Sequence, residues 1–550
     1  MPPKRKASAK QAPKADTKQP KQDGQKAVSH DINVPLDEGF HGAGKVYIDD
    51  DSIIYDASLN QTNIGGNNNK FYRLQLLYGN KKNQYFVHTR WGRVGEFGQV
   101  KTMGPMDLEA ALKEYEKKFK DKSGHKWEER SEPAKKGKYT FIERSYEDDE
   151  DEDEDEDEGD GQVKKEEGAD DEEPESKLPR QTQRLMELIF NQNHFNAVLE
   201  SIGYNANKLP LGKLSKATLK QGFEHLKELA SLIKHPALAQ NKYGLSQAEA
   251  IEDFSNKYYS TIPHEFGRNR PPLINNNDIL RQETSMLDTL TDMEVANTIM
   301  KTTVDKKKDA DSINTLDKRF NELNMNEMTP LDHKSSEYKA LSEYLIKSSG
   351  TAHGIKYRLE DIFRIERVGE ADRFAKSKYA KIHKSDKRLL WHGSRTTNFG
   401  GILSQGLRIA PPEAPVSGYA FGKGIYLADM SSKSAQYCRS GMSGGTGLLL
   451  LCEAELGSPM YEIPDGDFMA EENAKKHKCI STLGVGRTAP QGWMDGEVIH
   501  ESLKGVTVPG PAKGLGDNKA HGQRGYLMHN EYICYDVAQL RLRYLFQVGM

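Results

Sequence analysis

The sequence predicts a multidomain α+β protein, with a β-rich domain, an all-α bundle and an α+β domain built on a sheet. Three observations lead to this prediction. At 550 residues the chain exceeds the size at which one hydrophobic core keeps growing. Its pattern changes along the chain from short β-like runs, through helical periodicity, to a glycine-rich mixture of both. Two strongly charged stretches lie before and between these parts.

The start of the chain is rich in Lys, Ala, Pro and Gln and shows no apolar periodicity. We therefore expect a disordered basic tail over residues 1–39. Lys4, Arg5 and Lys6 form a cluster that favours nuclear import and so predicts a location in the nucleus. A nucleic-acid-attracting arm, or a solvated tail with neither role, is the alternative. The segment lacks the apolar stretch of a secretory signal.

Residues 40–146 alternate short β-rich runs with turns, as in KVYIDD, IIYDASL, FYRLQLLYG and QYFVHTRWGRVG. Gly and Asn breaks separate the runs, which favours an antiparallel sheet. A helix is expected to follow at about residues 106–120. We predict one β-rich domain here.

Residues 147–158 are twelve consecutive Asp and Glu residues, and the acidic composition continues beyond them. Their mutual repulsion disfavours compact structure, so residues 147–177 are predicted to be a disordered acidic linker. The linker is either modified itself, or competes with DNA for basic domains, or is a plain solvated spacer.

Helical periodicity dominates residues 178–307, which predicts a helical bundle. One apolar stripe, with steps of four and three residues, comprises Leu219, Phe223, Leu226, Ala230 and Ile233. A second stripe comprises Met286, Leu290, Met293 and Met300. Both stripes are interpreted as core.

Residues 316–550 mix glycines with β-like runs such as GTGLLLLCEAEL and EYICYDV, which predicts an α+β domain with a sheet core. The four cysteines form no CxxC pair, so neither a zinc finger nor a disulfide framework is expected. Mean hydropathy is −0.78. All apolar runs fall short of the roughly 18 residues that span a bilayer, so no membrane partner is expected.

Three short motifs carry candidate chemistry. LWHGSR at 390–395 ends an apolar run in a His, a Gly and a hydroxyl, and the glycines of GKGIY at 422–426 permit close approach to a ligand. NEYI at 530–533 places Glu531 on a β-like run. Taken singly, each motif has an ordinary structural interpretation: a core histidine, a glycine turn and an edge carboxylate. Neither glycine motif matches a GxGxxG or a Walker A loop.

Together the motifs resemble the catalytic domain of the poly(ADP-ribose) polymerases. His392, Tyr426 and Glu531 occur in this order within WHGSRTTNFGGILSQGLRIAPPEAPVSGYAFGKGIYLADMSSKSAQYC and HNEYICYD. PLGKLSKATLKQGFEHLKEL and IPHEFGRNRPPLINN resemble the family's regulatory bundle. YDASLNQTNIGGNNNKFYRLQLL, with WGR at 91–93, resembles its WGR domain. Without zinc fingers or ankyrin repeats, the chain is similar to the short, DNA-dependent branch, including the second and third members.

The resemblance implies a DNA-break-activated enzyme that cleaves NAD+, releases nicotinamide and attaches ADP-ribose chains to itself and other proteins. NAD+ is then a consumed substrate, and no metal is expected. Because nicotinamide leaves as a neutral base, the reaction needs no general acid, but it does need stabilisation of an oxocarbenium-like ribose. Glu531 would hydrogen-bond the ribose 2′-OH and orient the acceptor hydroxyl.

The resemblance also implies which residues contact NAD+. Gly393 would grip the carboxamide with help from Ser434, while the rings of Tyr426 and Tyr437 would sandwich the nicotinamide. The adenosine end would be bound by His392, Ser394, Gly401 and Arg408. The implied catalytic residues are Glu531, His392, Tyr426 and Lys433, the last supporting Glu531 or a ligand oxygen. Leu427 departs from the family, which often has Phe there.

In the segment that resembles a WGR domain, Trp91 is expected to stack at a DNA break and Arg93 to pair with phosphate. Lys70 and Arg73 would add attraction independent of sequence. A core position is the alternative for Trp91. Broken or nicked DNA with 5′-phosphate ends is the expected partner. DNA binding would loosen a bundle that obstructs the NAD+ pocket, with Asp288 facing the catalytic domain.

Alternatives remain open at this point. Retention of the His, Tyr and Glu residues favours a polymer product, but the third family member keeps them and is regarded as mainly a mono-transferase. A mono-ADP-ribosyltransferase and a catalytically silent scaffold that binds DNA ends are therefore both considered. A redox dehydrogenase lacks its nucleotide fingerprint here. The resemblance also allows an accessory protein that completes the active site and influences the acceptor residue type.

Overall fold

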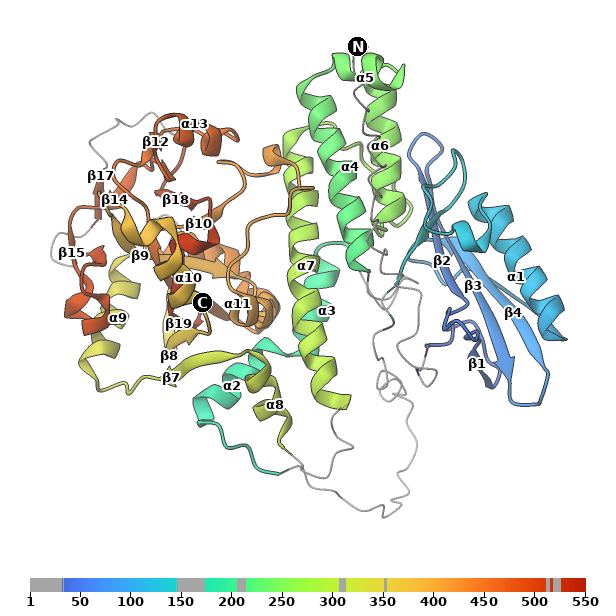
Figure 1. Cartoon of the computed structure of the whole chain (residues 1–550), viewed down its shortest axis with the longest axis horizontal. Helices are drawn as coiled ribbons and strands as arrows, with labels where there is room; N and C mark the ends of the chain where they lie inside the picture. The colour runs from blue at the N-terminus through green and yellow to red at the C-terminus, as the bar shows by residue number, and fades with distance from the viewer. Residues whose placement is uncertain are drawn as a thin grey trace, which may run out of the picture.

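The computed structural model describes residues 32, 34–144, 146, 174–204, 214–305, 313–350, 354–510, 515–517 and 526–550. A β-rich domain, a helical bundle and an α+β domain follow one another along the chain, which confirms the predicted fold class. The bundle stands between the other two domains, and its long helix α7 (Asn277–Asp305) lies next to the C-terminal domain (Figure 1). No described helix is long and apolar enough to cross a membrane.

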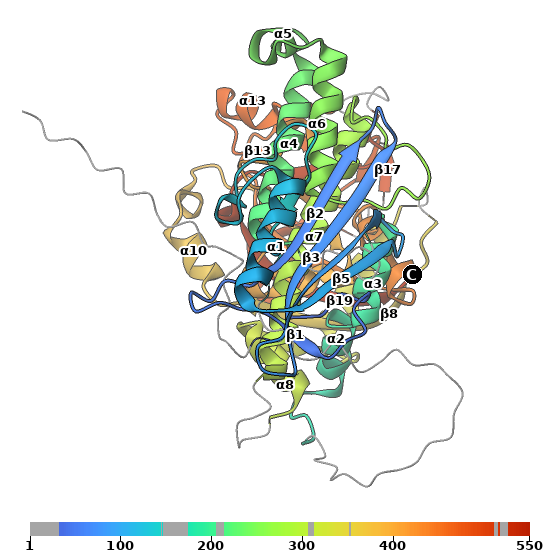
Figure 2. The same ribbon diagram turned by 90° about the vertical axis from the view of Figure 1, so that its right-hand side faces the viewer.

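The N-terminal domain is an antiparallel sheet with helix α1 (Leu108–Ser123) along one face (Figure 2). The strand order is β5-β4-β3-β2-β6, and β1 pairs with β3. The strands are β1 (Gly44–Val46), β2 (Asp56–Asn63), β3 (Asn68–Gly79), β4 (Tyr85–Arg93), β5 (Gln99–Met106) and β6 (Thr140–Ile142). The side chain of Asp107 caps the start of α1, and Tyr115 and Phe119 are buried beneath it.

Residues 34–39 differ from the prediction of a tail, because they pack against this sheet. Asp37 is 4% exposed. Its carboxylate accepts a hydrogen bond from Arg90 Nε at 2.7 Å, lies 3.1 Å from His88 Nε2 and pairs with Arg73 Nε at 3.6 Å. These buried basic groups need a counter-charge, which the segment provides. The remaining tail residues 1–31 and most of the predicted linker, residues 147–173, lie outside the described part.

The helical bundle is built around α4 (Lys216–Lys234), α6 (Gln247–Thr261) and α7. The predicted stripe on α4 is confirmed as core, with three residues buried and two partly buried. Met286 and Met293 of the second stripe are buried on α7. The other helices of this region are α2 (Arg180–Ile189), α3 (Gln192–Ser201), α5 (Ala237–Tyr243) and α8 (Thr315–Glu322).

Helix α7 contains several threonines whose hydroxyls form hydrogen bonds to the backbone of the same helix. The hydroxyls of four of them donate to the backbone carbonyl four residues earlier, at 2.8 to 3.0 Å: Thr284, Thr289, Thr291 and Thr298. Such bonds slightly weaken a helix, and β-branched residues add little helix propensity. Packing against neighbours, rather than intrinsic propensity, therefore holds α7 in place.

The C-terminal domain contains two main sheets, of strand order β15-β16-β9-β11-β19-β8-β7 and β10-β18-β13-β12, and a small β14-β17 pair. The strands of the larger sheet are β7 (Met325–Pro330), β8 (Arg358–Arg367), β9 (Lys387–Ser394), β11 (Thr446–Glu455), β15 (Trp493–Asp495), β16 (Thr507–Pro509) and β19 (Leu540–Gly549). The other strands are β10 (Ile425–Leu427), β12 (Tyr461–Ile463), β13 (Ser481–Gly484), β14 (Thr488–Pro490), β17 (Leu515–Asp517) and β18 (Glu531–Cys534). The helices are α9 (Ser336–Lys347), α10 (Glu370–Lys376), α11 (Phe399–Gln405), α12 (Ser431–Ala435) and α13 (Ala470–Lys476).

The two main sheets meet where β9 passes the end of β10. Trp391 and Ala428 exchange backbone hydrogen bonds of 2.8 and 2.9 Å. This bridge brings the predicted site residues at the end of β9 next to those on β10.

Candidate active site

Strands β10 and β18 place two predicted catalytic residues side by side. Tyr426 pairs with Ile533 in the antiparallel register, and Glu531 begins the same strand. A Cβ atom on Gly424 would lie 2.5 Å from Ile533 Cγ2. Glycine is therefore needed for β10 to approach β18 this closely, which explains one glycine of the GKGIY motif.

His392 lies at the end of β9, where its ring is fixed by the neighbouring strand. Its Nδ1 atom is 3.0 Å from the carbonyl oxygen of Tyr426. Because a carbonyl only accepts, Nδ1 carries the proton and Nε2 presents a lone pair. Burial lowers the pKa of His392, so the ring is neutral at pH 7. A neutral ring with an accepting Nε2 suits a ribose hydroxyl.

Gly393 follows His392 and touches the backbone of α12. A Cβ atom on Gly393 would lie 2.0 Å from the carbonyl oxygen of Ser434. Glycine is therefore required at this position, and the close approach puts its backbone amide beside the buried Ser434. Ser394 Oγ, next along β9, accepts a hydrogen bond of 2.9 Å from Asn398. The segments that carry Gly393 and Ser434, the two residues predicted to bind the carboxamide, are thus in backbone contact.

Glu531 and Lys433 form an ion pair in a mostly buried position. Lys433 Nζ lies 2.5 Å from Glu531 Oε1, and the two side chains are 17% and 10% exposed. Burial lowers the pKa of Lys433, but the charge and hydrogen bond of Glu531 outweigh it, so the pKa is raised overall. Lys433 therefore stays charged and holds the carboxylate in one place.

The two predicted nicotinamide-binding tyrosines differ in their hydrogen bonds and exposure. The Tyr426 hydroxyl donates to the carbonyl of Gly422 and accepts from the amide of Phe421, both at 2.8 Å. Tyr437 is 58% exposed. Burial and then the charge of Glu531 raise the pKa of Tyr437, so its ring lies within electrostatic reach of the carboxylate. One ring is locked, and the other is open to a ligand.

Helix α7 engages the predicted adenosine end of the site. Asp292 forms a close ion pair with Arg408. Gly401 is buried on α11, and a Cβ atom there would lie 3.2 Å from the backbone oxygen of Asp292. Arg408 is thus already paired with a residue of α7 in this conformation.

Two further side-chain contacts join α7 to the catalytic domain. The hydroxyl of Tyr419 donates to Asp288 Oδ2 at 2.8 Å, as expected for an Asp288 that faces this domain. Arg395 Nη1 donates to Thr289 Oγ1 at 2.7 Å. Neither Thr289 nor Asp292 was predicted, because nothing in a helical stripe reveals which polar residues meet a partner domain.

On the N-terminal sheet, Trp91 lies in an aromatic and basic cluster. Its ring stacks on Tyr72, with centroids 6.1 Å apart and an interplanar angle of 26°. Lys122 Nζ lies 4.7 Å from the centre of the Tyr72 ring and 5.9 Å from that of Tyr139. Trp91 is only partly buried, so a face of this cluster remains accessible. The sequence pattern did not identify Lys122 or Tyr139, which belong to separate segments.

The three predicted basic DNA contacts have different surroundings. Lys70 is exposed on β3. Arg93 donates to backbone oxygens of the bundle, including that of Asn269 at 2.9 Å. Arg73 is 4% exposed and pairs with Asp56 at 3.1 Å. The structure thus gives Arg73 a different role from the predicted one: it is a buried charge of the sheet, with no face for DNA.

Two exposed hydrophobic side chains shortly before Glu531 in the chain were missed by the sequence analysis. Tyr526 is 55% and Met528 44% exposed. Burial and then the charge of Glu531 raise the pKa of Tyr526. Isolated aromatic residues in loops carry no periodic signal, so only the folded structure brings them together.

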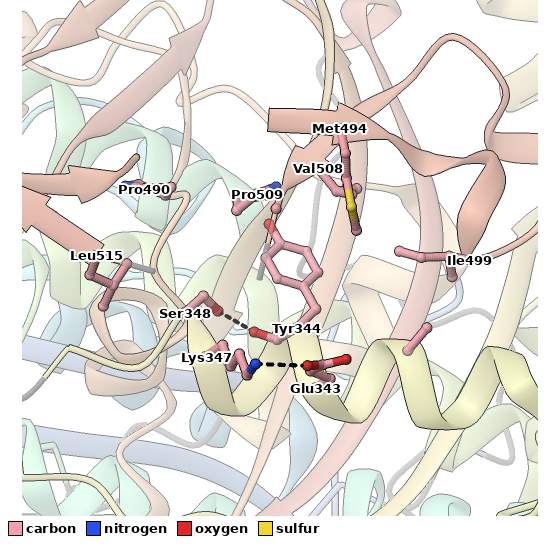
Figure 3. A pocket seen from close by; sticks show the side chains of 12 residues that line it. Glu343, Tyr344, Lys347, Ser348, Pro490, Met494, Ile499, Val508, Pro509 and Leu515 are labelled. Carbon is pink, nitrogen blue, oxygen red and sulfur yellow. Dashed lines mark hydrogen bonds and ion pairs between the residues drawn. The ribbon is translucent and has the colours of Figure 1, made fainter. Parts of the chain in front are cut away.

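A separate, largely apolar cavity lies between α9 and strands β15 and β16 (Figure 3). Tyr344 and Ser348 form part of its wall. Ser348 Oγ also accepts a hydrogen bond from Trp391 Nε1 at 3.0 Å, so it borders the side of β9 opposite His392. None of the predicted NAD+-binding residues lines this cavity.

Three family models match the chain in the order in which its domains occur. Residues 55–134 match the WGR domain, residues 176–320 the poly(ADP-ribose) polymerase regulatory domain, and residues 335–550 the poly(ADP-ribose) polymerase catalytic domain. Poly [ADP-ribose] polymerase 2 of Arabidopsis thaliana is 39% identical over 505 residues, covering 90% of this chain and 73% of the relative. Poly [ADP-ribose] polymerase 2 of Homo sapiens is 38% identical, covering 92% and 81%.

These matches, on a fold with this two-sheet domain, define an NAD+ ADP-ribosyltransferase that consumes NAD+ as its substrate. The chain belongs to the poly(ADP-ribose) polymerase family and carries a WGR domain, a regulatory domain and a catalytic domain. Its partners are DNA and the proteins that it modifies. Among the described residues, no group of His, Cys, Asp and Glu side chains is arranged to hold a metal ion.

Proposed function

We propose that this poly(ADP-ribose) polymerase is switched on by DNA breaks and that Glu531 is its catalytic carboxylate. The observation that carries the proposal is the Lys433–Glu531 ion pair beside β10, where Tyr426 and His392 are also fixed. A lysine-held carboxylate next to aromatic rings matches the needs of a reaction that develops positive charge on ribose.

The proposed reaction proceeds by dissociation of the positively charged nicotinamide ring of NAD+, which leaves as neutral nicotinamide. The Tyr426 and Tyr437 rings hold the nicotinamide, and the backbone of Gly393 with Ser434 holds its carboxamide. As the bond between ribose carbon and nicotinamide nitrogen breaks, its electron pair stays with the nitrogen and positive charge grows on the ribose. Glu531 stabilises that charge through the 2′-OH and then orients the acceptor hydroxyl, whose oxygen bonds to the same carbon as its proton passes to the Glu531 carboxylate. Lys433 keeps Glu531 in position.

At the adenosine end, His392 and Ser394 bind the ribose and Arg408 binds the adjoining part of NAD+. In the structure, Asp292 of α7 engages Arg408. We therefore infer that α7 must shift before this end of NAD+ binds fully. Activation then means a change in the population of released α7, which requires DNA to bind that state more tightly.

The WGR domain reaches α7 through a short chain of contacts. Asn69 of β3 donates to the backbone oxygen of His264 at 2.7 Å, and His264 Nε2 lies 2.9 Å from Glu283 of α7. Burial lowers the pKa of His264, but Glu283 outweighs it, so the pKa is raised overall. Arg93 donates to Asn269 of the same loop, which carries His264 and leads into α7. A DNA-induced shift of the WGR sheet is therefore transmitted to α7 through this loop.

The proposed DNA target is a break with a 5′-phosphate, because Trp91 and its aromatic neighbours offer a stacking surface and Lys70 and Lys122 offer charge. Work at DNA breaks places the protein in the nucleus, and the Lys4-Arg5-Lys6 cluster, outside the described residues, fits import. We propose that an accessory protein which completes the site binds over Tyr526 and Met528, two exposed side chains that shortly precede Glu531 in the chain.

Incorporation of labelled NAD+ with and without 5′-phosphorylated nicked DNA tests the proposed function. We expect nicotinamide release and a smear of modified protein only when nicked DNA is present. A discrete gel shift would instead support the mono-transferase, and absence of nicotinamide release would support the silent scaffold. Equal activity with and without DNA would refute regulation by breaks.

The contact between Asp288 and Tyr419 gives the regulation a pH dependence. Burial raises the pKa of Asp288 from 3.8 to about 7, and the hydrogen bond from Tyr419 only partly opposes this. Asp288 therefore binds a proton more tightly when α7 is docked than when α7 is released. Docking of α7 accordingly weakens as the pH rises toward 7 and above. We expect the ratio of DNA-free to DNA-saturated activity to rise from about pH 6 to about pH 8. Asp288→Asn should flatten the rise, and an equally steep rise in that variant would contradict the assignment.

Lys70 and Arg73 form a matched pair for testing the DNA surface, since both are basic residues of β3. Lys70→Ala is expected to weaken binding of nicked DNA and to lower the slope of log affinity against log salt by about one. Arg73→Ala is expected to lower Tm instead, because it leaves Asp37 and Asp56 with fewer buried partners. Binding titrations at several salt concentrations and thermal melts distinguish the two; a reversed pattern would refute this division of roles.

A further inference from the structure

The two residues that flank Glu531 both point away from it and bind the same carboxylate. Side chains alternate along a strand, so Asn530 and Tyr532 lie on the face of β18 opposite Glu531. Asn530 Nδ2 donates to Asp429 Oδ2 at 2.7 Å, and the Tyr532 hydroxyl donates to the same oxygen at 2.9 Å. Asp429 thus holds the strand on both sides of the catalytic position.

Asp429 also occupies a key place along its own segment. It follows Ala428, which is hydrogen-bonded to β9, and it lies between Tyr426 of β10 and Lys433 of α12. Its contacts therefore join the segment that carries Tyr426 and Lys433 to the strand that carries Glu531.

The surroundings of Asp429 are buried, and both of its side-chain hydrogen bonds end on Oδ2, whereas Oδ1 has no hydrogen-bond partner among the described residues. Asp429, Asn530 and Tyr532 are 0%, 4% and 1% exposed. Asn530 Oδ1 accepts from the amide of Gly486 at 2.8 Å, and Arg388 Nη1 donates to the Tyr532 hydroxyl at 3.2 Å. Burial raises the pKa of Asp429 to about 6, opposed by the hydrogen bonds from Asn530 and Tyr532. A buried carboxylate of this kind is retained only with its partners in place.

We propose that Asp429 is a positioning residue for Glu531: by binding both neighbours of Glu531 from the segment that carries Lys433, it sets the geometry of the Lys433–Glu531 pair. The inference rests on the proposed catalytic role of Glu531. The hydrogen bonds of Asp429 go to the neighbours of Glu531 and not to the paired side chains, so it acts through the backbone of β18 and the start of α12.

Loss of this carboxylate leaves two buried donors without their acceptor, so the strand around Glu531 is held by its pairing with β10 and β13 alone and the position of Glu531 is less tightly fixed. A displacement of about 1 Å in a catalytic group costs up to about a hundredfold in rate. The side chains proposed to bind NAD+ on either side are fixed by other contacts: the Tyr426 hydroxyl by Gly422 and Phe421, and the His392 ring by the carbonyl of Tyr426. Loss of Asp429 should therefore lower kcat while KM for NAD+ stays close to the wild-type value.

The test compares Asp429→Ala and Asp429→Asn in the full chain with saturating nicked DNA. Both hydrogen bonds end on one oxygen, so an asparagine that keeps its oxygen there still accepts both. We expect kcat to fall about tenfold to a hundredfold in Asp429→Ala and to be largely restored in Asp429→Asn. Equal losses in the two variants, or a loss confined to KM, would overturn the inference.

A second pair of variants keeps the test valid if Asp429→Ala does not fold. Tyr532→Phe removes one of the two hydrogen bonds to Asp429 and should lower kcat. Its matched control is Tyr544→Phe, because the Tyr544 hydroxyl also donates to a buried carboxylate, that of Glu337, at 2.8 Å. Tyr544 lies on β19, a strand that carries no proposed site residue. Wild-type kcat in Tyr532→Phe, or equal losses in both tyrosine variants, would overturn the inference.

Glu531→Gln, measured alongside, distinguishes failure of this inference from failure of the proposed function. If Glu531→Gln retains full activity, the catalytic role of Glu531 is refuted. If Glu531→Gln is inactive while the Asp429 and Tyr532 variants retain wild-type kcat, only the positioning role is refuted.

Discussion

Glu531→Gln is expected to bind NAD+ normally but to lose about 100- to 1,000-fold in kcat. Glutamine keeps the shape of the side chain while removing the negative charge that stabilises the ribosyl cation. It also ends the ion pair with Lys433, which lies 2.5 Å away in the wild type. Initial rates of nicotinamide release at saturating nicked DNA measure the loss, and titration with NAD+ measures KM.

The matched control is Glu471→Gln on the exposed helix α13. Glu471 also forms an ion pair of 2.5 Å with a lysine, Lys475, but it makes none of the contacts proposed for binding or catalysis. Exposed pairs of this kind contribute little to stability, so the control should keep wild-type activity and Tm. Similar activity in Glu531→Gln and Glu471→Gln would refute the central assignment.

The double variant Asp288→Ala/Asp292→Ala is expected to raise activity without DNA by about tenfold to a hundredfold, the range of typical allosteric couplings. The two substitutions remove the contacts of α7 with Tyr419 and Arg408. Released α7 then leaves Arg408 available to NAD+ without help from DNA. Activity at saturating DNA should change little, because the wild-type helix is already displaced there.

Asp278→Ala provides the control for this release. Asp278 lies at the start of the same helix, its side chain is 96% exposed, and its ion-pair partner, Arg281, is on α7 itself. Removing its charge leaves the contacts with the catalytic domain intact, so activity without DNA should stay low. If the double variant behaves like Asp278→Ala, these two aspartates do not hold the enzyme inactive.

The sequence predicts the domain order and the helical stripes well, because each depends on local periodicity. Prediction of burial from the sequence fails where one segment of the chain covers another. β3 is buried on both faces: α1 packs on one, and Gln75 of the other donates to the backbone of Pro35 at 2.9 Å. Lys70 therefore reaches solvent whereas Arg73 does not, although both are basic residues of one strand.

The candidate site shows the same division. His392, Tyr426 and Glu531 are identified through the order of motifs, and strand pairing then accounts for their proximity. Their neighbours depend on tertiary contacts that no motif contains. Asp292 reaches Arg408 only because α7 lies along α11, and Asp429 reaches both sides of Glu531 only because β10 pairs with β18.

The threonines of α7 whose hydroxyls bond to its backbone affect how the enzyme responds to DNA under the proposed activation. The contact toward the WGR domain, at Glu283, and those toward the catalytic domain, at Asp288 and Asp292, lie within nine residues of one helix, or about 14 Å. A helix with low intrinsic helix propensity depends on its packing contacts, so it is displaced more easily than a helix of high propensity. Under the proposed activation, the threonine content of α7 affects how readily this helix is released, while His392, Tyr426, Lys433 and Glu531 all lie on other elements.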